Sequence, residues 1–231
     1  MKPYSVNRVL NGMSALPKRI QFLPLALRIL AILGFAMAYS EETEGEAANI
    51  LIFGDSLTAG FGVDFEQAYP NRVQELIDRD GLAGNVIPSG VSGETSAGGL
   101  RRVSWAMRVP IDIFVLALGG NDGLRGIDLE DTRHNLLEIA NKVRAQNPSV
   151  RIAIAGMQMP PNLGAHYTEA FAALYPSVAA ELDAYLIPFL LEGVGGDPKL
   201  NLSDGIHPNP EGHKRIARYV YGHLKTLLGE D

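Results

Sequence analysis

The stretch NILIFGDSLTAG at residues 49–60 decides the fold, because a short apolar run stops at a glycine and passes directly into a polar turn. Comparable runs follow at residues 111–118 (IDIFVLAL), 150–155 (VRIAIA) and, more weakly, 184–189 (AYLIPF). A further weak run, NVIP at 85–88, lies between the first two. Short β-branched runs without polar alternation are typical of strands that are buried on both faces, and so they predict a parallel sheet.

Helical patterns fill the intervals between these runs, with apolar residues recurring every three or four positions. The last helix has a clear start, because Asn209 suits the N-cap, Pro210 the first helical position and Glu211 the first turn. Alternating strands and helices predict an α/β fold, a three-layer α/β/α sandwich, over residues 49–231. His213 falls in this last helix, where we expect a solvated side chain.

The N-terminal segment differs in charge from the rest of the 231-residue chain. Residues 1–40 hold five Lys or Arg and no acidic residue, and their apolar part ends in small residues. This pattern predicts a signal peptide with cleavage after Ala38 or Ser40, or else a retained N-terminal anchor, and the start could be Met1 or Met13. Either outcome places the rest of the chain in the periplasm or outside the cell, near a membrane only through its N-terminus.

Residues 41–48 (EETEGEAA) read as an acidic linker. Residues 41–231 contain fifteen basic residues and all 26 acidic ones, so attraction to nucleic acid is not expected. The chain has no cysteine, which excludes a disulfide framework, a thiol nucleophile and a cysteine-ligated zinc site. Oligomeric state has no signature in the sequence.

Gly-rich polar turns follow the predicted strands, and ligands of parallel sheets gather at that edge. Asp204 and His207 share one such turn, a spacing that lets the carboxylate bond one imidazole nitrogen and leave the other free as a general base. Ser56 follows the first strand and is the candidate nucleophile for that base. Gly93 and the Asn121 amide, with the Ser56 N–H, are candidate oxyanion-hole donors.

Four apolar residues beside these turns are candidates for substrate binding, and each could equally serve plain packing. They are Leu124, Met157, Pro160 and Ile206. No metal or organic cofactor is expected.

These turns resemble the four sequence blocks of the SGNH (GDSL) hydrolase family: GDS at 54–56, a glycine in GVSGETSAGG at 90–99, GGND at 119–122 and DGIHP at 204–208. The flanking sequence is similar to the bacterial thioesterase I/lysophospholipase/arylesterase subgroup. The resemblance implies a flavodoxin-like sheet of about five strands in the order 2-1-3-4-5. It also implies a serine esterase acting on carboxylic esters and thioesters through an acyl-enzyme, with a small-molecule acyl ester as substrate.

Two other functions are compatible with parts of this pattern. A carbohydrate O-acetylesterase could use the same catalytic blocks, although the sequence carries no appended carbohydrate-binding module. A non-catalytic lipid-binding module could use the same scaffold, but the complete set of triad and oxyanion residues argues against it.

Overall fold

A parallel five-stranded sheet in the order β2-β1-β3-β4-β5 forms the centre of the molecule. The structure is a computed structural model that describes residues 47–229. The strands are β1 (Ala48–Gly54), β2 (Gly84–Gly90), β3 (Ile113–Ala117), β4 (Arg151–Ala155) and β5 (Tyr185–Ile187). Every neighbouring pair is parallel, and the strand order predicted from the family resemblance is confirmed.

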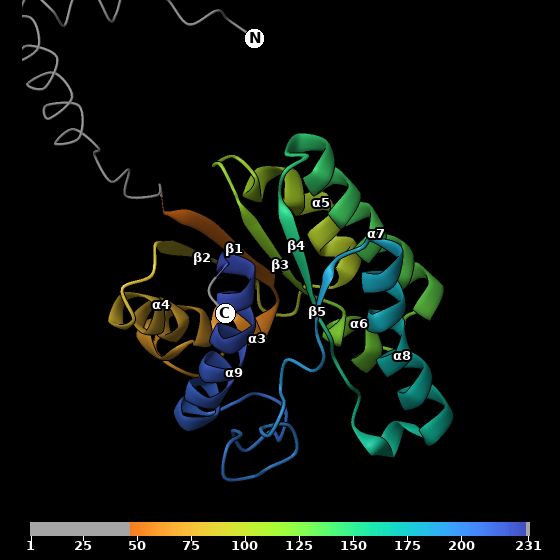
Figure 1. Ribbon diagram of the computed structural model, residues 1–231. Helices are drawn as coiled ribbons and strands as arrows, with labels where there is room; N and C mark the ends of the chain where they lie inside the picture. Colours follow the sequence, from red (N-terminus) through yellow and green to blue (C-terminus); the bar gives the residue numbers. More distant parts are fainter. Residues whose placement is uncertain (1–46, 230–231) are drawn as a thin grey trace, which may run out of the picture. The chain divides into compact units, whose positions relative to one another are not determined.

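Helices cover both faces of this sheet (Figure 1). On one side α4 (Tyr69–Arg79) packs against α9 (Pro210–Leu228), and on the other α7 (Leu129–Gln146) packs between α5 (Ser96–Ala106) and α8 (Ala165–Glu181). Short elements at the strand ends complete the fold: α3 (Ser56–Ala59), α6 (Gly120–Leu124), η3 (Phe65–Gln67) and η4 (Pro161–Leu163). The predicted three-layer α/β/α sandwich is therefore confirmed.

Strand β1 lies in the interior of the sheet, between β2 and β3, and its side chains are apolar on both faces. The four residues 50–53 are almost completely buried, and they align with residues of β2 on one side and β3 on the other. At the end of the strand, a Cβ on Gly54 would lie 2.1 Å from the Thr58 hydroxyl oxygen and 2.8 Å from the Ala117 carbonyl oxygen. Only glycine leaves room for these two atoms, so the close approach of Thr58 and of β3 to the end of β1 depends on it.

Several predicted boundaries differ from the observed ones by one to two residues. The strand predicted at 111–118 spans Ile113–Ala117, and just before it the Asp112 carboxylate accepts a hydrogen bond from the Asn49 backbone N–H (2.8 Å). The first strand begins at Ala48, inside the segment predicted as linker. Helix α9 begins as predicted, with the Asn209 side chain accepting from the N–H groups of Glu211 and Gly212.

The predicted signal or anchor at 1–40 and most of the predicted linker lie outside the described residues. Within residues 47–229, no helix combines the length and the apolar character needed to cross a membrane.

Candidate active site

The first site residues come from the turn between β1 and α3. Asp55 is the N-cap of α3, and its Oδ1 accepts the Leu57 N–H at 3.0 Å. This cap fixes Ser56 as the first helical residue, where its side chain is largely shielded from solvent. The turn therefore holds the serine at the carboxyl edge of the sheet, in an environment with little water.

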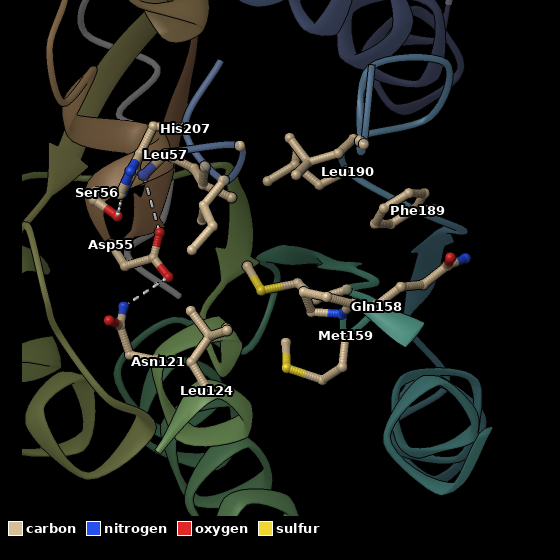
Figure 2. A pocket seen from close by; sticks show the side chains of 18 of the residues that line it. Asp55, Ser56, Leu57, Asn121, Leu124, Gln158, Met159, Phe189, Leu190 and His207 are labelled. Atoms are coloured by element: carbon tan, nitrogen blue, oxygen red, sulfur yellow. Dashed lines mark hydrogen bonds between the residues drawn. The ribbon is translucent and has the colours of Figure 1, made fainter. Parts of the chain in front are cut away.

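The predicted triad residues lie together as a continuous hydrogen-bonded chain. The Ser56 Oγ is 3.0 Å from the His207 Nε2 (Figure 2). The His207 Nδ1 is 2.7 Å from the Asp204 Oδ2. The second carboxylate oxygen, Oδ1, accepts the backbone N–H groups of Ile206 and His207 at 2.9 and 3.0 Å. A carboxylate next to Nδ1 places the proton on that nitrogen, so Nε2 is left free to accept the serine proton.

The Asp204 carboxyl group is held in its charged form by the loop that carries it. Desolvation acts to raise its pKa, but the N–H groups of His207 and Ile206 and the His207 ring outweigh this and lower the pKa to about 2. Asp204 is therefore ionised at any pH at which a serine esterase works, and it can orient the imidazole throughout that range.

Phe61 contacts His207 from outside the cavity, and the sequence did not predict this contact. Its ring centroid lies 4.5 Å from that of His207, at an interplanar angle of 43°. The ring covers one face of the imidazole while remaining half exposed itself. The sequence signal that could have indicated this contact is an aromatic residue five positions after Ser56.

The Asn121 amide points toward Asp55 and Ser56, as Figure 2 shows. Its Nδ2 donates to the Asp55 Oδ2 at 3.2 Å and to the Glu94 carbonyl oxygen at 3.1 Å. Gly93 lies in the adjacent turn with a φ of 77°, and its carbonyl oxygen accepts from Arg125 Nη2 at 2.9 Å. The Asn121 amide is thus already hydrogen-bonded to other groups of the protein. A substrate oxyanion would have to share or replace these hydrogen bonds.

Asp55 is a buried carboxyl group that touches both the serine turn and Asn121. Burial raises its pKa to about 6, against the lowering effects of the Leu57 N–H, His207 and Asn121. The bond to Leu57 gives Asp55 a role in fixing the turn. The bond to Asn121 joins residues 66 positions apart, so no local pattern could have predicted it.

We expect the stability of Asp55→Asn, relative to that of the native protein, to be greater at pH 8 than at pH 4. The pKa of Asp55 in the folded protein, about 6, lies above the ordinary value of 3.8. The contribution of this group to the free energy of unfolding is therefore complete below pH 4 and is lost as the pH rises through 6. The loss reaches about 3 kcal/mol. The amide variant carries no charge and keeps one oxygen for Leu57. It loses the acceptor for Asn121, which lowers the stability by the same amount at every pH. Urea unfolding at pH 4, 5, 6 and 8 measures the difference, and a pH-independent difference would contradict this account.

A cavity of about 320 Å³ opens beside Ser56 and His207. All four predicted substrate-binding candidates line it: Leu124, Met157, Pro160 and Ile206. Figure 2 shows Met159, Phe189 and Leu190 across the cavity from Ser56. The cavity lining includes Asn121 but not Gly93.

The loop after β5 forms a wall of this cavity, which was not predicted from the sequence. Its apolar residues Phe189, Leu190 and Leu191 all line the space, together with two glycines. The run at 184–189 was predicted as a strand, but β5 ends at Ile187, before the prolyl residue Pro188. Phe189, the last residue of that run, therefore lies in the loop after β5 and lines the cavity.

His213 is completely buried, so the prediction of a solvated side chain is wrong. Its Nδ1 accepts the Tyr69 N–H at 3.2 Å, and burial lowers its pKa to about 4. It lies three residues before the buried Ile216, on the same face of α9, and this spacing was the signal for its burial.

Three comparisons place this geometry among known proteins. Residues 52–215 match the GDSL-like lipase/acylhydrolase family. The chain is 37% identical over 204 residues to esterase TesA of Pseudomonas aeruginosa, a match that covers 87% of this chain and all of that one. It is also 37% identical over 186 residues to thioesterase 1/protease 1/lysophospholipase L1 of Escherichia coli K12, with 80% and 87% of the two chains covered.

Among solved structures, the psychrotrophic esterase EstA from Pseudoalteromonas sp., in a form inhibited by monoethylphosphonate, matches with a TM-score of 0.74 and 29% identity. The match covers 79% of this chain and 99% of that one. The resemblance seen in the sequence motifs is thereby confirmed over most of the domain. The chain belongs to the GDSL-like lipase/acylhydrolase family.

Proposed function

We propose that this protein is a serine esterase that hydrolyses carboxylic esters and thioesters of single acyl chains. The observation that carries the proposal is the chain from Ser56 through His207 to Asp204, which opens onto an apolar cavity. Relatives named as esterase and as thioesterase/lysophospholipase support the same chemistry.

In the acylation step, the Ser56 Oγ attacks the carbonyl carbon of the substrate while His207 Nε2 removes its proton. The charge that develops on the carbonyl oxygen is stabilised by the N–H groups of Ser56 and Gly93 and by the Asn121 amide, which are proposed here as the oxyanion hole. His207 then gives its proton to the departing alkoxide or thiolate, and the acyl group remains as an ester on Ser56.

Deacylation repeats these steps with water as the nucleophile. His207 takes a proton from water, the hydroxide attacks the acyl-enzyme, and the proton returns to the Ser56 oxygen as the acid is released. Asp204 stays ionised and stabilises the imidazolium that forms in each half-reaction.

The size and chemistry of the cavity support an acyl substrate. A volume of about 320 Å³ lies at the lower end of the range for ligand pockets. One flexible chain fits such a space better than a polysaccharide, and the two methionine side chains facing it can adapt to different chain lengths. We therefore favour a lipid-type or aryl ester over an acetylated carbohydrate.

The N-terminal sequence supports a location in the periplasm or outside the cell. A basic segment without acidic residues precedes the domain, as in exported proteins. The domain that follows has no cysteine that an oxidising compartment could modify.

The test of the proposal is a series of p-nitrophenyl esters from acetyl to dodecanoyl, with matching acyl thioesters. We expect Leu124→Ser to lower kcat/KM for the octanoyl ester about tenfold and to leave the acetyl ester nearly unchanged, because Leu124 lines the cavity. Leu163→Ser is the matched control, since Leu163 is similarly exposed but does not line the cavity. Equal losses on all chain lengths would contradict an acyl-binding role for the cavity.

A further inference from the structure

The turn at residues 91–95 carries Gly93 and is fixed against the nucleophile strand. The Val91 N–H donates to the Gly54 carbonyl oxygen at 3.0 Å, and the Glu94 N–H closes the turn on the Val91 carbonyl oxygen at 3.1 Å. Asn121 bonds the carbonyl oxygen of Glu94. Glu94 is therefore next to Gly93 in the chain and in contact with Asn121, so its position affects both proposed oxyanion donors.

Arg102, on α5, holds the side chain of Glu94. Its Nε donates to the two Glu94 carboxylate oxygens at 3.0 and 3.1 Å. The same guanidinium donates to the hydroxyl and the carbonyl oxygen of Ser89, at the end of β2, at 2.7 and 3.2 Å. It also lies 4.0 Å from the ring centroid of Phe53, near the end of β1. One planar cation thus joins the ends of two strands to the turn that contains Gly93.

The ion pair is shielded from solvent and closely fitted. The side chains of Arg102 and Glu94 are only 18% and 8% exposed. A Cβ on Gly98 would lie 2.9 Å from the Glu94 Cγ, so glycine at that position makes room for the carboxylate. A buried ion pair contributes little net stability compared with neutral residues of the same size, and stability alone is a weak reason for this arrangement.

We propose that Arg102 and Glu94 are positioning residues, which hold Gly93 and Asn121 where they can stabilise an oxyanion. This inference rests on the proposed esterase function. Neither residue lines the cavity, so both act through the donors rather than by touching the substrate. The pair keeps the turn in place during turnover, when the Asn121 amide must exchange its protein partners for the substrate oxygen.

A double-mutant cycle between this pair and Asn121 tests the inference. We expect Asn121→Ala alone to lower kcat about 100-fold, as is usual for one oxyanion donor. The neutral pair Arg102→Met with Glu94→Gln is expected to lower kcat about 30-fold with KM changed less than threefold. Asn121→Ala added to that background should then cost only about fivefold, because the amide is no longer held in place.

Arg133→Met is the matched control, because Arg133 pairs with Glu181 between α7 and α8, away from the cavity. It should leave kcat unchanged and preserve the full 100-fold effect of Asn121→Ala. Arg102→Lys is a second variant should the neutral pair not fold, since it keeps the charge but loses the bidentate contact. We expect it to lower kcat at least tenfold with little change in KM.

Two outcomes would overturn the inference. One is a full 100-fold cost of Asn121→Ala in the neutral-pair background, and the other is a kcat within twofold of the native value in the folded Arg102 variants. If the activity still depends on Ser56, either result would refute the positioning role of Arg102 and Glu94. The esterase proposal would be unaffected. Activity that does not depend on Ser56 would refute the esterase proposal itself.

Discussion

Ser56→Ala is expected to lower kcat/KM for a p-nitrophenyl ester by about 10⁴-fold or more while the protein remains folded. The variant has no Oγ, so the acyl-enzyme cannot form and only slow hydrolysis by water remains. The serine side chain is small, and its one described hydrogen-bond partner is the His207 ring. His207 is not a buried residue, so removal of the hydroxyl leaves no polar group of the core without a hydrogen bond. Initial rates at pH 8, with thermal unfolding as the folding check, measure this effect.

Ser203→Ala serves as the control for this substitution. Ser203 also belongs to the edge that carries the site, but it is exposed and has no place in the proposed chain of proton transfer. Its kcat/KM should stay within twofold of the native value. Retention of more than about one-hundredth of the native activity by folded Ser56→Ala would mean that another group is the nucleophile.

His207→Ala is expected to have the second largest effect, because the serine then has no base. Reaction of Ser56 with a fluorophosphonate should slow by about 10³-fold or more, and ester turnover should fall in parallel. The reason lies in the 3.0 Å contact from Ser56 Oγ to Nε2, the one described route by which the hydroxyl proton can leave to a side chain. Rates of covalent modification, followed by intact-protein mass, measure the step directly.

His134→Ala is the control for that substitution, since His134 is an exposed residue on α7. It should react with the fluorophosphonate at the native rate. If His207→Ala reacted as fast as the native protein, the hydroxyl would be activated by some other group and the assignment of the base would be wrong.

The strands could be predicted from the sequence because their burial is local and continuous. The run at 49–53 is apolar at nearly every position, and both faces of β1 are indeed covered. The start of α9 was equally predictable, since Asn209, Pro210 and Glu211 act within one helical turn. In each case the physical cause lies within a few residues of its effect.

The close contacts of the site depend on chain segments that are far apart in the sequence. Ser56 and His207 are 151 positions apart in the sequence, and their meeting was suggested by the shared carboxyl edge of the predicted sheet and by the family motifs. Arg102 meets Glu94 because helix α5 begins between them and turns the arginine back onto the loop. No periodic pattern marks such a pair, and the same holds for Asp55 and Asn121.

The burial of His213 shows how a residue type can mislead. Histidine is polar, which favours a solvated position, yet the apolar spacing of α9 places residue 213 on the inner face. The Tyr69 N–H supplies a hydrogen bond to Nδ1, while the buried Nε2 has no hydrogen-bond partner among the described residues. Helical position was therefore the better guide than side-chain polarity.

The most direct test of the central claim is to locate the adduct after native protein reacts with a fluorophosphonate. We predict one equivalent of label per chain, found by peptide mass spectrometry on Ser56 in the GDSLTAG segment, with complete loss of ester hydrolysis. Label on any other residue, or no label in folded protein that still hydrolyses the ester, would contradict the account.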